Sequence, residues 1–142
     1  MTYTMQVTVD SAAPHQLAEW WADILGWEVE PSDEEFIRSM IDQGFADEAD
    51  TMVHNGVLVW RAGQAIRHPE ALTGAPRLLF QLSSDPKQGK NRVHLDLRGE
   101  EPVPDDERQR ILAAGATELW SAEQGPHRWT TYADPEGNEF CL

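Results

Sequence analysis

The fold is decided by the stretch Arg92-Val93-His94-Leu95-Asp96-Leu97-Arg98, in which apolar and polar residues alternate strictly. A period of two is typical of a half-buried β-strand, so His94 and Asp96 are predicted to share its polar face. Downstream, a helix is predicted from about Asp105 to Gly115, followed by strands at residues 117–120 and 128–133. The turn at residues 134–138, Asp-Pro-Glu-Gly-Asn, leads into a last strand at 139–142.

The first half of the chain shows the same order of elements. Residues 5–10 alternate as a strand, Pro14 suits the first turn of a helix, and Gly26 ends the helical spacing that follows. Strands are predicted at residues 27–29, 57–61 and 78–82. The order strand, helix, three strands therefore occurs twice, which predicts an α+β protein built from two similar βαβββ modules.

The segment at residues 31–55 has no counterpart in the second half and is predicted to be an insertion. Ser32 and Glu35 have the spacing of a capping box at the start of a helix. The acidic stretch at residues 46–50 is predicted to be a solvated loop. The domain prediction is therefore one domain over residues 1–142, with module one at about 1–86 and module two at about 90–142.

Composition excludes several classes of protein. The chain has 142 residues, enough for one core, and no stretch approaches the ~20 apolar residues of a membrane span. With 25 acidic and 11 basic residues, its formal charge of −14 repels nucleic acids and anionic membranes, so we expect neither as a partner. Residues 1–10 lack the pattern of a secretory signal, and the single cysteine, Cys141, excludes an intramolecular disulfide. We therefore expect a cytoplasmic protein.

Three motifs in this order resemble the glyoxalase-like branch of the vicinal oxygen chelate superfamily, which includes bleomycin resistance proteins and dioxygenases. They are Leu-Ala-Glu-Trp-Trp at 17–21 with Ile-Leu-Gly-Trp at 24–27, Lys-Asn-Arg-Val-His-Leu-Asp-Leu at 90–97, and Asp-Pro-Glu-Gly-Asn-Glu-Phe-Cys at 134–141. The resemblance implies mixed sheets curved around a central cup, a small-molecule ligand and a homodimer.

Laid onto that fold, the alternation assigns one face to the helices and the other to the cup. The apolar side chains of Met5, Val7, Val9, Val93, Leu95 and Leu97 would face the helices. The polar set would line the cup: Gln6, Thr8, Asp10, Gln81, His94, Asp96, Glu139 and Cys141.

The resemblance also places four positions that hold a divalent metal in other members, and here these are Gln6, Gln81, His94 and Cys141. The two carboxylates expected among them are absent. A site from His94, Glu139 and Gln6 or Cys141 would have an incomplete ligand set, so the prediction is at most one divalent ion (Zn, Ni, Mn or Fe).

Each candidate also has a structural interpretation. His94 is a ligand, a catalytic group or a hydrogen-bonded histidine, and Asp96 either orients it or pairs with a neighbouring arginine. Glu139 is either a proton-shuttling carboxylate with a raised pKa or a hydrogen-bonded structural group. Cys141 is a ligand or a packed side chain. The basic residues Lys87, Lys90 and Arg92 either touch an acidic group or are solvated.

Two functions from different classes follow from these residues. One is an enzyme, a lyase or isomerase acting on a small oxygen-bearing substrate, with His94, Glu139 and Asp96 as catalytic groups and Gln6, Thr8, Gln81 and Cys141 as ligand-binding groups. The other is a metal-free protein of the bleomycin-resistance type that sequesters a drug-like or cationic compound.

Overall fold

The computed structural model describes residues 1–72, 74–100 and 102–142. Contacts within the chain divide it into two compact units, Met1–Ser84 and Asp85–Leu142. Each unit contains a four-stranded mixed sheet, and the first also contains a two-stranded hairpin.

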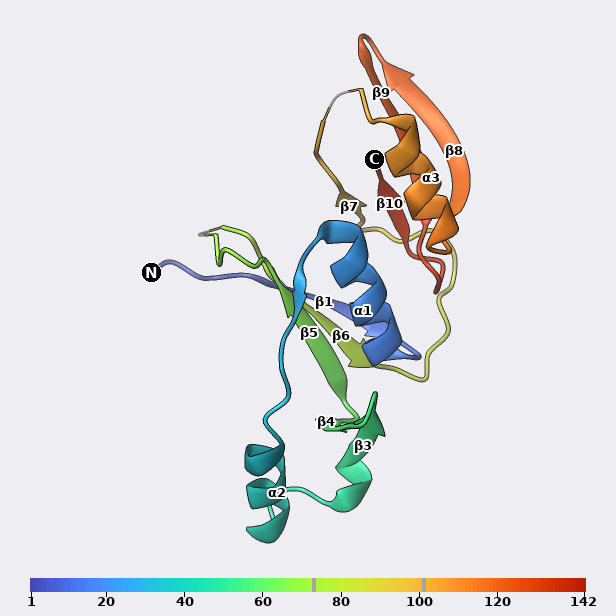
Figure 1. Ribbon diagram of the computed structural model, residues 1–142. Helices are drawn as coiled ribbons and strands as arrows, with labels where there is room; N and C mark the ends of the chain where they lie inside the picture. The colour runs from blue at the N-terminus through green and yellow to red at the C-terminus, as the bar shows by residue number, and fades with distance from the viewer. Residues whose placement is uncertain (73, 101) are drawn as a thin grey trace. The chain divides into compact units, whose positions relative to one another are not determined.

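The sheet of the first unit has the order β1-β6-β5-β2. These strands are β1 (Gln6–Ser11), β6 (Arg77–Leu82), β5 (Gly63–Arg67) and β2 (Glu28–Val29). β1 runs parallel to β6, and β5 is antiparallel to β6 and β2. Helix α1 (Pro14–Leu25) packs against this sheet, as Figure 1 shows. Their shared core is formed by buried side chains of Leu17, Ala18, Trp21, Ile66, Leu78 and Phe80.

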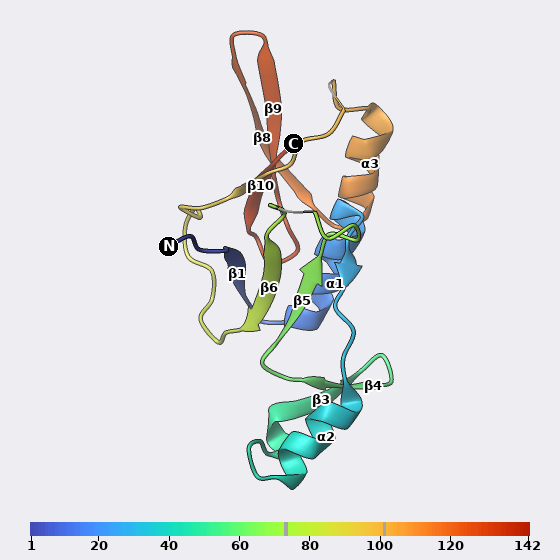
Figure 2. The ribbon, with the colours of Figure 1, turned by 90° about the vertical axis from the view of Figure 1, so that its left-hand side faces the viewer.

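The inserted segment lies between β2 and β5 and has its own structure. It consists of α2 (Glu34–Asp42), the 3-10 helix η1 (Glu48–Asp50), β3 (Thr51–His54) and β4 (Val57–Trp60). Figure 2 shows it beyond one end of β5. The β3–β4 turn is Asn55-Gly56, both with positive φ (50° and 80°), which is the conformation that a two-residue hairpin turn requires.

The second unit repeats the topology of the first. Its sheet has the order β7-β10-β9-β8, with β7 parallel to β10 and the other pairs antiparallel. The elements are β7 (Leu95–Asp96), α3 (Asp105–Ala113), β8 (Thr117–Gln124), β9 (His127–Ala133) and β10 (Glu139–Cys141). Ile111, Tyr132 and Phe140 are fully buried. The predicted α+β class with two βαβββ modules is confirmed.

No helix within the described residues is both long and apolar enough to cross a lipid bilayer.

Three predictions about residues 32–61 need correction. The strand predicted at residues 57–61 is present as β4, but it pairs with β3 outside the main sheet, and the strand in that place of the sheet is β5. Asp33 caps α2 by accepting a hydrogen bond from the Phe36 N–H (2.9 Å), while the Ser32 hydroxyl donates to the Leu58 carbonyl (2.7 Å). The stretch at residues 46–50, predicted to be a loop, contains η1.

Two apolar residues also depart from the predicted pattern. Val93 and Met5, expected to face the helices, are 80% and 79% exposed and lie outside the strands. The strand predicted at residues 92–98 is reduced to Leu95–Asp96. Its partner β10 is only three residues long, and only Phe140 and Cys141 of β10 pair with β7. The sequence at His68-Pro69 and at Thr73 to Pro76 predicts a turn-rich connection between the strands expected at residues 57–61 and 78–82. Thr73 of this connection lies outside the described residues.

Candidate functional site

Three candidate ligands come together in the second unit. Cys141 of β10 is directly opposite Asp96 of β7 in the parallel register, and His94 stands two residues before Asp96. The Nε2 atom of His94 is 3.3 Å from Oδ1 of Asp96. One potential ligand atom each from His94, Asp96 and Cys141 lies within 4.8 Å of the other two. We call these three residues the β7–β10 triad.

The chemistry of the β7–β10 triad fits a transition metal. Imidazole nitrogen, carboxylate oxygen and cysteine sulfur are the three ligand types that zinc takes in proteins, and three protein ligands leave a fourth position for water or substrate. The His94 and Asp96 side chains are 37% and 56% exposed, and Cys141 is half-buried, so the cluster is accessible from solvent. Thr131 of β9 lies beside it, with its hydroxyl 3.4 Å from the Cys141 sulfur.

Glu139 lies outside the β7–β10 triad although it is on the same strand as Cys141. Its carboxylate is only 9% exposed. One oxygen accepts from the Lys87 ammonium (3.1 Å) and the other from the Asn91 backbone N–H (3.0 Å). Burial alone would favour the neutral acid, but the Asn91 and Lys87 hydrogen bonds outweigh it and lower the pKa of Glu139. The carboxylate is therefore ionised at neutral pH, and Lys87 of the predicted basic patch touches an acidic group of its own chain.

The turn before β10 explains the position of Glu139. Oδ1 of Asp134 accepts from the backbone N–H groups of Glu136 and Asn138, both at 2.9 Å. The Asn91 side chain donates in turn to Oδ1 of Asn138 (2.9 Å). The predicted Asp-Pro-Glu-Gly-Asn turn therefore holds the segment at Asn91 against the start of β10.

The site residues predicted in the first unit share the sheet face opposite α1. Gln6, Thr8 and Asp10 alternate on β1, and the register places Gln81 of β6 beside Asp10. Gln81 is exposed. The prediction that residues of both modules line one cup stays a prediction.

Arg77, which the sequence analysis did not single out, organises this face. It donates to Oε1 of Gln6 (2.6 Å) and makes a two-pronged pair with the Glu30 carboxylate (2.8 and 2.7 Å). The hydrogen bonds from Arg77 to Glu30, with the charge of Arg77, lower the pKa of Glu30. A guanidinium against the Gln6 oxygen disfavours a metal cation at the same oxygen, because like charges repel. No sequence signal pointed to Arg77, since its contact with Gln6 depends on the β1–β6 register.

A hollow of about 490 Å³ adjoins the same face. Leu79, Gln81 and Arg77 of β6 line it from the sheet, and Ser32, Phe36 and Trp60 from the inserted segment. Its volume is within the range of small-molecule sites. The presence of Phe36 and Trp60 at this hollow could not be predicted from sequence, because the position of the inserted segment depends on tertiary packing.

The fold is that of an α+β protein with two similar modules, and comparison with known proteins agrees. The chain matches the model of the glyoxalase-like domain over residues 6–142 and belongs to that family. No curated protein matches it.

Solved structures of the glyoxalase/bleomycin resistance/dioxygenase superfamily share the fold. The fosfomycin resistance protein FosX from Listeria monocytogenes has 12% identity and a TM-score of 0.63, covering 100% of this chain and 92% of that one. A glyoxalase/bleomycin resistance protein/dioxygenase family enzyme from Burkholderia phytofirmans PsJN has 15% identity and a TM-score of 0.59, covering 96% and 93%. At these identities the likeness establishes the fold alone.

Proposed function

We propose that this protein is a metal-dependent enzyme, a lyase or isomerase, that acts on a small oxygen-bearing molecule. The observation that carries the proposal is the β7–β10 triad, whose nitrogen, oxygen and sulfur atoms lie within 4.8 Å of one another. The fold shared with the fosfomycin resistance protein and the Burkholderia enzyme supports small-molecule chemistry.

Each residue of the second unit has a distinct role in this proposal. His94, Asp96 and Cys141 hold the ion, which when bound supplies a Lewis acid for a substrate oxygen. Glu139, which sequence reasoning made a catalytic candidate, instead positions the residues before β7 through Lys87 and Asn91. Thr131 supports the Cys141 sulfur.

In the first unit, we propose that Gln81 binds the polar part of a small molecule held in the hollow of that unit. Its amide is exposed at the hollow on the sheet face and can both donate and accept a hydrogen bond. Gln6 and Thr8 complete the polar surface, with the Gln6 amide fixed by Arg77 and donating to the Thr8 hydroxyl (3.3 Å). The proposal also includes a cytoplasmic location and a homodimeric assembly. Sedimentation of the purified protein tests the assembly.

The second candidate is a metal-free protein that binds a drug-like or cationic molecule. The observation that favours it is the 3.3 Å contact between Nε2 of His94 and Oδ1 of Asp96, in which each side chain partners the other. The formal charge of −14 attracts cationic ligands.

Metal uptake separates the two candidates. The purified protein is dialysed against zinc, nickel, manganese or iron(II), and bound metal is measured by mass spectrometry. We expect one ion per chain in the wild type and a loss in His94→Ala and in Cys141→Ala. His127→Ala is the matched control, because His127 is exposed and outside the β7–β10 triad. Absence of uptake, or uptake unchanged in both triad variants, contradicts the metalloenzyme and leaves the metal-free protein.

A further inference from the structure

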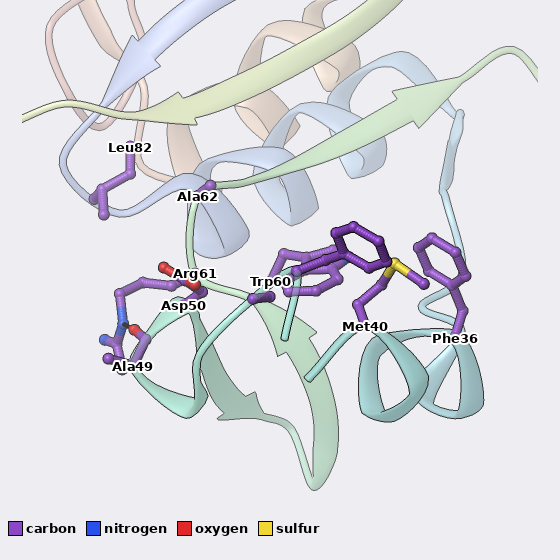
Figure 3. A pocket seen from close by; sticks show the side chains of 10 residues that line it. Phe36, Met40, Ala49, Asp50, Trp60, Arg61, Ala62 and Leu82 are labelled. Atoms are coloured by element: carbon purple, nitrogen blue, oxygen red, sulfur yellow. Dashed lines mark hydrogen bonds between the residues drawn. The ribbon is translucent and has the colours of Figure 1, made fainter. Parts of the chain in front are cut away.

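The inserted segment encloses a second hollow, of about 590 Å³. Its apolar lining includes Phe36 and Met40 of α2, Phe45 after α2, Trp60 of β4, and Ala62 and Leu82. In Figure 3, Phe36 and Met40 lie on one side of Trp60, Asp50 and Arg61 lie on the other, and Ala62 and Leu82 lie above. The volume is again within the range of small-molecule sites.

Three apolar side chains that line this hollow are exposed to solvent. Phe36 is 51% exposed and Phe45 is 76% exposed, and Leu82 beside them is 42% exposed. Apolar surface left in water costs free energy in proportion to its area, and a contiguous apolar patch on a soluble protein commonly marks a binding site. Aromatic rings from α2, β4 and the segment after α2 surround one space, which favours a flat ring as the occupant.

Contacts within the chain fix the β3–β4 side of the hollow. The β3–β4 hairpin is tied to α1, because Oε1 of Glu19 contacts Nε2 of His54 (2.7 Å) and accepts from the Asn55 amide (2.8 Å). The buried ring of His15 donates to the Trp60 carbonyl (3.0 Å). A preformed pocket spares a ligand the cost of ordering the chain.

The polar groups at the rim are already engaged by the protein. The Arg61 guanidinium donates to the carbonyls of Ala49 (3.0 Å) and Thr51 (2.8 Å). Oδ2 of Asp50 accepts from the Asp47 backbone N–H (2.8 Å). The hollow therefore favours an uncharged ring system over an ion.

This hollow adjoins the one on the sheet face. Phe36, Trp60 and Ala62 line both. A molecule whose ring system contacts Trp60 in the insertion can extend its polar end along the sheet face toward Gln81.

We propose that the inserted segment forms an aromatic-binding subsite, which selects small molecules carrying an uncharged planar ring system. This inference rests on the proposed function only in taking the bound molecule to be the one that Gln81 holds. The subsite is formed by apolar residues that line the hollow, and Trp60 stands where the two hollows adjoin. These residues are Phe36, Met40, Phe45, Trp60, Ala62 and Leu82.

The test is titration with N-phenyl-1-naphthylamine, a neutral aromatic dye whose fluorescence rises in apolar surroundings. We expect saturable binding of one dye per chain. Phe45→Ala should weaken binding about three- to tenfold, the effect of losing one aromatic contact. Ala49→Trp, which adds a large ring to the wall of the hollow, should abolish it. Both positions are exposed, so both variants are expected to fold.

Two matched control variants test whether the dye binds in this hollow. Tyr3→Ala removes an aromatic ring that is 87% exposed, and Val53→Trp adds one at a position 66% exposed; neither residue lines the hollow. Both should bind dye like the wild type. No saturable binding, or equal binding by Phe45→Ala, Ala49→Trp and the controls, overturns the subsite. His94→Ala should lose metal and keep the dye, so failure of the metal site and failure of the subsite are distinguishable.

Discussion

Replacing Glu139 by glutamine should destabilise the protein by about 2 kcal/mol. The carboxylate is 9% exposed and accepts from Lys87 and from the Asn91 N–H, and glutamine retains only one of its two oxygens. The NH₂ group of the glutamine then faces either the Lys87 ammonium or the Asn91 N–H, and neither can accept a hydrogen bond from it. A hydrogen bond to a charged group contributes roughly 1.5–3 kcal/mol, and breaking a fully buried ion pair costs about 3–5 kcal/mol. The Lys87 side chain is 23% exposed, so the ion pair is not fully buried and the expected loss lies in the range of roughly 1.5–3 kcal/mol.

Urea unfolding followed by circular dichroism measures this loss. Glu123→Gln is the matched control, because its ion pair with Arg128 is exposed (67% and 82%) and such pairs contribute about 0–1 kcal/mol. In a double-mutant cycle, Lys87→Met combined with Glu139→Gln should cost less than the sum of the two single changes. A loss in Glu139→Gln no larger than that of Glu123→Gln would refute the structural role assigned to Glu139.

Three further predictions test other parts of the fold. Arg77 lowers the pKa of Glu30, so the ion pair stabilises the folded protein at pH values above 4.5, the ordinary pKa of a glutamate, and this contribution is lost as the pH falls through the lower pKa of the folded state. In urea unfolding, the wild type should therefore lose more stability than Glu30→Gln between neutral pH and about pH 3. Equal losses would contradict this prediction. Gly63→Ala should cost about 1–3 kcal/mol in thermal unfolding, because its Cβ would collide with the Phe80 carbonyl oxygen, whereas Gly99→Ala, with open space around it, should be close to neutral. Asp33→Ala should cost about 1 kcal/mol by removing the cap of α2, and Asp42→Ala at the other end of that helix should cost less; a ranking in the opposite order would argue against the cap.

The alternating strands and the helical spacing predicted the two modules because both patterns report which face of an element is buried. Val7, Val9, Leu95 and Leu97 are partly buried, and their polar neighbours in β1 and β7 are exposed, as the period of two requires. The β3–β4 hairpin was missed although Asn55-Gly56 is a strong turn signal. Strand β5 was missed because Gly63-Gln64-Ala65-Ile66-Arg67 carries little alternation.

The site was less predictable than the fold. Sequence placed His94, Asp96 and Cys141 on polar faces, and the β7–β10 register brings them together. The partners of Glu139 could not be foreseen, because Lys87 and Asn91 reach it across 52 and 48 positions of the chain. The same holds for the contact of Arg77 with Gln6, which spans 71 positions.

Cobalt(II) absorption spectroscopy tests the central claim most directly, since a cysteine thiolate bound to cobalt gives an intense near-ultraviolet charge-transfer band. The wild type, titrated with cobalt(II), should develop this band together with visible bands of a low-coordinate ion, saturating at one ion per chain. Cys141→Ser should lose the charge-transfer band, and His94→Ala should lose cobalt binding, while His127→Ala behaves like the wild type. A wild-type spectrum that stays that of aqueous cobalt, or a charge-transfer band that survives in Cys141→Ser, would contradict a metal centre at His94, Asp96 and Cys141.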